Sequence, residues 1–140
     1  MITFKNNYLY RLSGRSPKVA GNTLLHAVNN YWYDSAGHNF EMDSGAMVLA
    51  EGNIFQNAQT PIESGAKGRL FTVPNTSAAA SCTASLGRVC QINGFGSSGS
   101  FSGSDTSFLA NFKGKNVASA KAYSDASVKN LPNTAGFGKI

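Results

Sequence analysis

The chain has few charged residues: Asp, Glu, Lys and Arg make up 14% of its 140 residues, against about 25% in an average globular protein. It also lacks long apolar runs. None approaches the roughly 20 residues of a membrane-spanning helix, so we expect a soluble chain with no membrane partner. Residues 1–5 show no basic segment leading into an apolar one, so no signal peptide is visible.

Small and polar residues are abundant instead. Gly, Asn and Ser together account for nearly a third of the chain, while 41% of the residues are apolar and 11% are aromatic. That apolar content is enough to bury a core, so we do not expect disorder over the full length. Low charge with many turn-forming residues favours stacked β-structure with polar turns over a helical bundle.

The positive charge is spread over the chain, although the formal net charge is +5. Residues 1–23 hold four basic residues and no acid, and residues 24–63 hold five acids and neither Lys nor Arg. Residues 64–140 hold eight basic and two acidic residues, thinly spread. No Lys/Arg cluster is interleaved with aromatics, and no helix-turn-helix or zinc-finger spacing occurs. We therefore expect no nucleic-acid partner.

The two cysteines, Cys82 and Cys90, lie eight residues apart in a stretch rich in Ser and Ala. A metal site needs more ligands than these, and the histidines, His26 and His38, lie far upstream, so we expect no metal and no cofactor. A redox pair normally has Cys-x-x-Cys spacing. We predict a disulfide that closes a short loop, which implies an oxidising compartment. Asn75 begins a glycosylation sequon, which is consistent with secretion.

A repeat with a period of 23 residues is the strongest internal signal. It relates three sets of positions, namely Asn7, Asn30 and Asn53; Ile2, Leu25 and Val48; and Phe4, Ala27 and Ala50. Such a period indicates a solenoid, and the alternation and Asn content favour β-strands over helical repeats. The sequence therefore predicts an all-β fold, a right-handed parallel β-helix with three short strands in each turn.

The repeated Asn has a physical role in such a fold. At a fixed corner it can adopt the left-handed backbone conformation and hydrogen-bond the equivalent residues of the turns above and below. The alternative is that the three Asn are ordinary turn residues.

We expect a single domain over residues 1–140, with repeat turns in 1–59 and C-terminal loops and an irregular wrap in 60–140. The periodicity fades from about Thr60, and residues 94–104 approach low complexity. Within 105–125 we predict one short helix that Asp105 or Ser107 would cap.

The local cluster with the clearest chemical potential surrounds Pro17. Arg15 and Lys18 flank this proline, which stiffens the loop and fixes where both cations point. Two such cations suit an anionic or carbonyl-bearing ligand, or a negative charge that develops during a reaction. The alternative is two solvated surface cations. Glu41 and Asp43 are two carboxylates on one strand face, without an evident partner.

The same region resembles fungal pectin lyases (polysaccharide lyase family 1). The stretch Leu-Ser-Gly-Arg-Ser-Pro-Lys-Val-Ala-Gly-Asn-Thr-Leu-Leu-His-Ala-Val-Asn-Asn-Tyr at residues 12–31 is similar to the central motif of that family. The similarity continues through several further blocks, at 37–41, 48–57, 82–90, 91–96 and 102–107. It covers most of residues 2–110 with a divergent tail, so the chain looks like the C-terminal portion of such an enzyme.

The resemblance implies cleavage of methyl-esterified homogalacturonan (pectin) by β-elimination, without a metal. Arg15 matches the catalytic arginine, the base that removes the C5 proton, and Lys18 matches the neighbouring lysine that contacts substrate. The related pectate lyases carry Arg-x-Pro-x-x-Arg, whereas the last position here is Ala20, which favours the ester-preferring branch. An arginine base needs its pKa lowered by about 4 units, which burial and neighbouring cations promote.

The resemblance also implies a secreted, extracellular protein whose signal peptide is lost with a missing N-terminal part. The alternative function is a catalytically inactive, truncated β-helix fragment that at most binds pectin. We expect a monomer when the protein is complete and association when it is a fragment, because a cut solenoid exposes strand edges. Trp32 sits at a repeat core position, and we expect it to be packed. For His26 and His38 we expect structural or surface roles.

Overall fold

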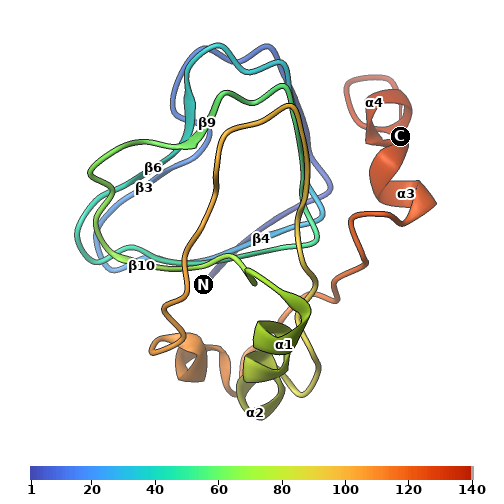
Figure 1. The fold of residues 1–140 in the computed structure, drawn as a ribbon. Helices are drawn as coiled ribbons and strands as arrows, with labels where there is room; N and C mark the ends of the chain where they lie inside the picture. Colours follow the sequence, from blue (N-terminus) through green and yellow to red (C-terminus); the bar gives the residue numbers. More distant parts are fainter. Residues whose placement is uncertain (140) are drawn as a thin grey trace.

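The computed structural model describes residues 1–139 and shows a β-solenoid of about three turns (Figure 1). Three sheets of parallel strands run along its axis. The first contains β1 (Ile2–Lys5), β4 (Leu24–Val28), β7 (Met47–Glu51) and β10 (Arg69–Phe71). The second contains β2 (Tyr8–Tyr10), β5 (Tyr31–Tyr33), β8 (Ile54–Gln56) and β11 (Gly94–Gly96). The third contains β3 (Lys18–Val19), β6 (His38–Met42) and β9 (Thr60–Ile62).

The strand register confirms the repeat of 23 residues. Ile2 pairs with Leu25 and Leu25 with Val48, while Phe4, Ala27 and Ala50 follow the same register. Equivalent positions therefore stack from one turn to the next, as a solenoid requires.

The repeated asparagines form a hydrogen-bonded ladder along the axis. The backbone N–H of Asn7 donates to Oδ1 of Asn30 over 3.0 Å, and that of Asn30 donates to Oδ1 of Asn53 over 2.9 Å. Asn53 continues the ladder by donating to Asn93, also over 2.9 Å. Asn93 lies 40 residues further along the chain, so the period of 23 does not reveal it.

The left-handed backbone conformation occurs one residue earlier than the repeat predicts. Asn6, Asn29 and Gly52 have φ angles of 59°, 54° and 62°, whereas the ladder asparagines are not among the residues with positive φ. The earlier residue makes the bend between the first and second sheets. The following Asn is thereby free to direct its side chain along the ladder. The left-handed bend and the ladder hydrogen bond are therefore made by two neighbouring residues, whereas the sequence assigned both roles to one Asn.

Aromatic side chains stacked from turn to turn form the core of the solenoid. Leu9, Trp32 and Phe55 occupy equivalent inward positions on β2, β5 and β8. The rings of Trp32 and Phe55 lie parallel with their centroids 4.8 Å apart, and both side chains are fully buried. This confirms that Trp32 is a packed core residue.

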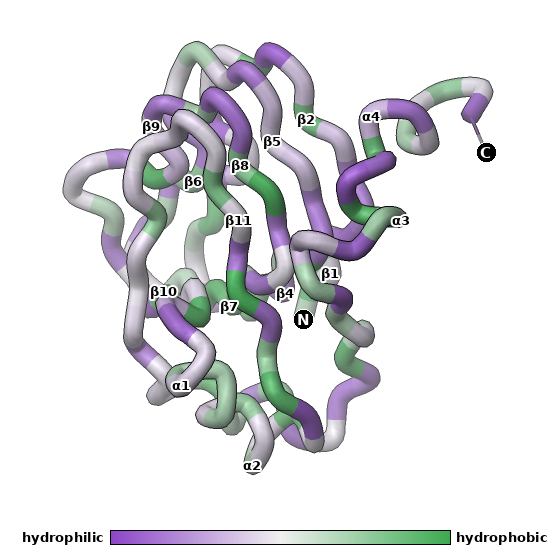
Figure 2. Tube along the Cα trace, turned by 45° about the vertical axis from the view of Figure 1, so that its right-hand side comes forward, coloured by the Kyte–Doolittle hydropathy of each residue, from purple (hydrophilic) through white to green (hydrophobic). Residues whose placement is uncertain are grey.

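Residues beyond the third turn contain more short helices than the one that the sequence predicts. These are α1 (Thr76–Ala79), η1 (Ala80–Cys82), α2 (Thr83–Leu86), η2 (Leu109–Phe112), α3 (Ala126–Lys129) and α4 (Leu131–Thr134). The helices α3 and α4 lie beside the solenoid near β1 and β2 (Figure 2), and each buries one apolar side chain, Val128 and Leu131 respectively. No helix within residues 1–139 is both long and apolar enough to cross a bilayer.

The expected helix near residue 105 differs in form. It is the 3-10 turn η2, whose N-cap is Phe108 and has no side-chain cap hydrogen bond. Asp105 instead accepts hydrogen bonds from the backbone N–H and hydroxyl of Ser107, at 2.9 and 2.6 Å. A short acidic side chain that bonds two residues ahead favours a turn over a helix start.

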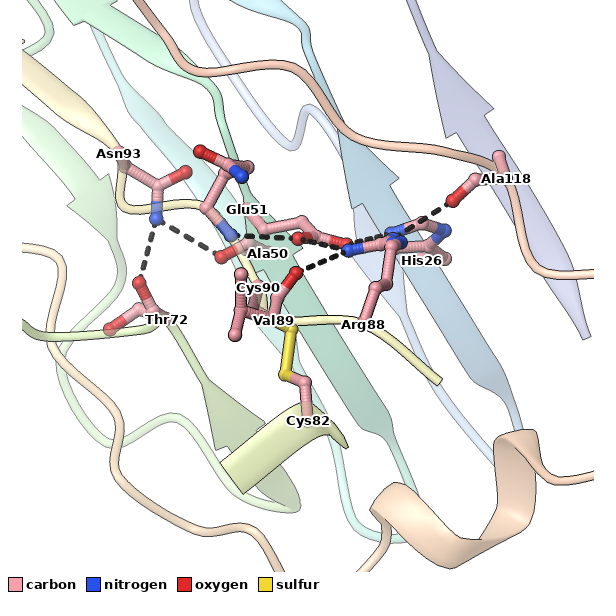
Figure 3. Close-up of a disulfide and its surroundings, with 11 residues drawn as sticks. His26, Ala50, Glu51, Thr72, Cys82, Arg88, Val89, Cys90, Asn93 and Ala118 are labelled. Atoms are coloured by element: carbon pink, nitrogen blue, oxygen red, sulfur yellow. Dashed lines mark hydrogen bonds and ion pairs between the residues drawn. A yellow bond between two sulfur atoms is a disulfide. The ribbon is translucent and has the colours of Figure 1, made fainter. Parts of the chain in front are cut away.

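The predicted disulfide is present and lies next to a buried ionic cluster (Figure 3). Cys82 and Cys90 are bonded, with their Cα atoms 5.7 Å apart. Nearby, the carboxylate of Glu51 contacts Nε2 of His26 at 2.7 Å and the guanidinium of Arg88 at 2.7 and 3.1 Å. Since both His26 and Glu51 are fully buried, this cluster fixes the disulfide-bearing segment to the first sheet and gives His26 a structural role.

Candidate functional site

The loop between β2 and β3 is held from beneath by the solenoid core. The indole N–H of Trp32 donates to the carbonyl oxygen of Ser16 over 2.7 Å. The backbone N–H of Ser16 donates to the carbonyl oxygen of Asn39 over 2.8 Å, and the Ser16–Pro17 peptide bond is cis. Gly37 packs so closely against this loop that a Cβ atom there would lie 2.3 Å from the carbonyl oxygen of Ser13. The backbone on either side of Arg15 is therefore well supported.

One buried carboxylate holds both predicted site residues. Lys18 and Glu41 are direct neighbours on the parallel strands β3 and β6. Oε1 of Glu41 accepts a hydrogen bond from Nζ of Lys18 over 2.8 Å, and Oε2 accepts one from Nε of Arg15 over 2.6 Å. The Glu41 side chain is 9% exposed, whereas those of Arg15 and Lys18 are 63% and 45% exposed. The structure thus brings Arg15 and Lys18 together at the surface with their counter-ion beneath them.

Three further ionisable side chains complete the cluster. Nε2 of His38 contacts Oε2 of Glu41 at 2.9 Å and a carboxylate oxygen of Glu63 at 3.7 Å. Asp43 lies on the other side, with Oδ2 at 3.3 Å from Nζ of Lys18. The sequence singled out Glu41 and Asp43 without a partner, and treated His38 as a structural or surface residue. Glu63 was not singled out; it directly follows β9, whose Thr60 and Ile62 pair with His38 and Phe40 on β6.

The ion pairs shift the pKa values of this cluster in opposite directions. Hydrogen bonds from Lys18, Arg15 and His38 lower the pKa of Glu41 to about 2. The hydrogen bond to Glu41 raises the pKa of Arg15, and hydrogen bonds to Glu41 and Asp43 raise that of Lys18. This geometry therefore keeps the guanidinium of Arg15 protonated, since nearby negative charge favours the charged form. A base needs the reverse shift, so Arg15 can act as one only after its contact with Glu41 opens.

Arg15 keeps hydrogen-bonding capacity for a ligand. Its Nε is bonded to Glu41, and within residues 1–139 neither terminal amino group of its guanidinium donates a hydrogen bond. A guanidinium in this state presents a planar fork of N–H donors that suits a carbonyl or carboxylate group. Arg15 thus combines a fixed position with free donors, whereas Nζ of Lys18 is already shared between two carboxylates.

Three members of the cluster have the ligand types for a divalent cation. One ligand atom from each of His38, Glu41 and Glu63 can be chosen such that all three lie within 4.8 Å of one another. Both oxygens of Glu41 already accept hydrogen bonds, from Lys18 on one side and from Arg15 and His38 on the other. A metal ion here would compete with two positively charged side chains for the same carboxylate, so these residues fit a set of counter-ions better than a metal centre.

Comparisons with known proteins identify the family of this chain. The model of the pectate lyase family matches residues 1–140, the whole chain. The chain therefore belongs to the pectate lyase family. It is 62% identical to pectin lyase B of Emericella nidulans, 61% to probable pectin lyase A of Neosartorya fischeri and 59% to probable pectin lyase A of Aspergillus oryzae. These comparisons confirm the resemblance found in the sequence.

This pectate lyase family chain spans little more than a third of the length of those relatives. Each comparison covers 100% of this chain and 37% of the relative.

Proposed function

We propose that this chain is part of a polysaccharide lyase that cleaves methyl-esterified homogalacturonan by β-elimination. In this proposal Arg15 removes the C5 proton of a galacturonate methyl ester and Lys18 contacts the substrate. The observation that carries it is the arrangement of Arg15 and Lys18 on the single carboxylate of Glu41, with the outer donors of Arg15 free. Relatives of about 60% identity that are named pectin lyases support the choice of substrate.

The reaction that we propose is balanced in protons and electrons. The C5–H bond breaks and its proton goes to the base, while the C4–O bond breaks and its electron pair leaves with the glycosidic oxygen. A C4–C5 double bond forms, the released oxygen takes a proton from solvent, and the base then returns the C5 proton to solvent. The ester carbonyl withdraws the negative charge that builds at C5, and a guanidinium or ammonium group beside it stabilises that charge. For Arg15 to be the base, substrate binding must separate it from Glu41.

The test is the formation of the unsaturated uronide, followed by its ultraviolet absorbance, with highly esterified pectin as substrate. We expect Arg15→Ala to reduce the rate by at least about 100-fold, as is typical for a residue that transfers a proton. Arg11→Ala is a matched control, because Arg11 lies in the same loop but pairs with Asp34 at 2.9 Å. Equal rates for the wild type and Arg15→Ala would refute the proposal.

Substitution of Glu41 distinguishes between two alternative roles of Arg15, as the base and as a cation that binds substrate. If Arg15 is the base, Glu41→Gln removes the charge that raises its pKa, and the optimum of activity moves to lower pH. If Arg15 only binds substrate as a cation, Glu41→Gln weakens its positioning and lowers activity at every pH. The pH–rate profile of Glu41→Gln distinguishes these outcomes.

The second candidate function is pectin binding without catalysis, by a fragment that associates with itself. The strands β1, β2 and β3 each stand at the end of a sheet, with one strand partner within the described residues. Unpaired strand edges promote association. Light scattering on the isolated chain tests this proposal, and a monodisperse monomer would contradict it. Binding to esterified pectin without an unsaturated product would favour this function over catalysis.

We also propose that the protein is secreted and carries a glycan on Asn75. The disulfide between Cys82 and Cys90 supports an oxidising compartment. Asn75 is exposed and caps α1, because its Oδ1 accepts the N–H of Ala78 over 2.8 Å. A glycan attaches to the nitrogen of an Asn side chain, so the cap and the glycan are compatible. A fungal secretion host should yield a heavier wild type than Asn75→Gln, and equal masses after secretion would refute the glycan.

A further inference from the structure

The cluster around Arg15 carries more negative than positive charge. Its two cations, Arg15 and Lys18, are surrounded by three carboxylates within the described part of the chain. Glu41 contacts both cations and so compensates for one of the two positive charges. Asp43 and Glu63 then bring the count to three carboxylates against the two cations of Arg15 and Lys18.

The two outer carboxylates differ from Glu41 in position and exposure. The carboxylate of Asp43 pairs with Nζ of Lys18 at 3.3 Å, and its side chain is 51% exposed. Glu63 lies 3.7 Å from His38, and its side chain is 27% exposed. Neither accepts a side-chain hydrogen bond from Arg15 in the structure of residues 1–139. Both carboxylates nevertheless help to raise the pKa of Arg15 through space, so their charges are felt where a ligand of Arg15 would lie.

We propose that Asp43 and Glu63 are specificity-determining residues that make this site prefer the uncharged methyl ester of galacturonate to the free carboxylate. The inference rests on the proposed function and deepens it. A methyl ester brings only a carbonyl dipole to Arg15, so the outer carboxylates do not oppose it. A free galacturonate carboxylate brings a full negative charge, which Asp43 and Glu63 repel. Without these two carboxylates, Arg15 and Lys18 would favour the free galacturonate carboxylate over its methyl ester.

The expected size of the effect follows from distance and exposure. Both carboxylates are partly solvated, so water and salt weaken their repulsion of a bound anion. One unit charge at such a distance in a half-exposed site changes relative affinity by about two- to fivefold. Glu41 is unsuitable for this test, because its substitution also releases Arg15 and Lys18.

The experiment compares two substrates in the intact protein, highly methyl-esterified pectin and fully de-esterified polygalacturonate. The measured quantity is the ratio of kcat/KM on the first to that on the second, for the wild type, Asp43→Asn, Glu63→Gln and the double variant. We expect each single variant to lower the ratio about two- to fivefold and the double variant to lower it further. High salt should shrink these differences. Asp125→Asn is the control, since Asp125 contacts Lys121 and Ser127 and not this cluster.

The substrate ratio is insensitive to a general loss of folded protein, because both rates then fall together. An unchanged ratio in the double variant overturns the inference even if absolute rates decline. Failure of the proposed function has a different signature, namely equal rates for wild type and Arg15→Ala. In that case the same variants are compared by their affinity for esterified and de-esterified oligogalacturonides in the Arg15→Ala background. An unchanged ratio of dissociation constants there also overturns the inference.

Discussion

Trp32 donates its indole N–H to the carbonyl oxygen of Ser16 over 2.7 Å, although the two residues lie 16 positions apart. The ring of Trp32 stacks on Phe55 in the centre of the solenoid, and Ser16 directly follows Arg15. One side chain thus joins the apolar core to the backbone of the candidate site. The position of Arg15 therefore depends on the packing of the solenoid core.

We predict that Trp32→Phe lowers activity more than stability alone explains. Phe preserves most of the stacking but lacks the N–H donor, so the carbonyl of Ser16 loses its buried partner. Loss of that hydrogen bond should reduce the free energy of unfolding by about 1–3 kcal/mol and displace the Arg15 loop. Urea denaturation and initial rates measure the two effects. Phe55→Leu is the control, because it weakens the same stack without touching the loop, and an equal loss of rate per folded molecule would contradict the prediction.

The ion pairs of Glu41 predict a dependence of stability on acidity. Its pKa in the folded protein is about 2, below the roughly 4.3 of a glutamate in an unfolded chain. The folded state is thus favoured above about pH 4.3, and this contribution is lost as the pH falls toward 2. We expect the melting temperature of the wild type to fall more steeply over this interval than that of Glu41→Gln. Parallel pH profiles for the two proteins would show that Glu41 is not responsible.

The buried cluster beside the disulfide predicts a large cost for removing one partner. Burial disfavours ionised Glu51, but hydrogen bonds from His26 and Arg88 outweigh this and lower its pKa. Arg88→Met should leave a buried carboxylate without its cation and destabilise the protein by about 3–5 kcal/mol. The double variant Arg88→Met, Glu51→Gln should recover part of that loss. Both are measured by chemical denaturation, with the exposed pair of Lys121 and Asp125 as a control worth less than about 1 kcal/mol.

In the asparagine ladder, we expect an interior position to contribute more to the free energy of unfolding than the first position. Asn30 accepts from Asn7 and donates to the carbonyl of Phe4 and to Asn53, and it is fully buried. Asn30→Ala leaves several of these groups unpaired and should cost about 2–4 kcal/mol. Asn7→Ala removes fewer buried partners and should cost less. Thermal denaturation of the two variants ranks them, and a reversed order would refute this account of the ladder.

Positions repeated at a fixed interval could be predicted from the sequence, because each solenoid turn imposes the same requirement on its residues. The registers of Ile2, Leu25 and Val48 and the burial of Trp32 follow in this way. Asn93 escaped prediction because the last step of the ladder is 40 residues long. The short helices beyond the third turn escaped because segments of three or four residues carry little periodicity.

The two cations of the candidate site could be grouped from the sequence, but their pairing with the carboxylates could not. Arg15 and Lys18 share one short motif, so local sequence identifies them together. Glu41 and Glu63 join them only through the stacking of β3, β6 and β9, a three-dimensional relationship that local spacing does not express. The resulting reversal of the expected pKa shift of Arg15 likewise depends on a residue 26 positions away.

The greater length of one step of the asparagine ladder, 40 residues in place of 23, has a consequence for protein engineering. The hydrogen bond between Asn53 and Asn93 is as short as the one before it, so the intervening excursion with α1, α2 and the disulfide leaves the stacking intact. The ladder thus fixes its anchoring residues and not the length of the chain between them, while the excursion adds buried residues of its own, such as Ala79, Cys82 and Cys90, to a second core cluster. Protein engineers can therefore vary the exposed part of this segment, provided that its buried residues are kept.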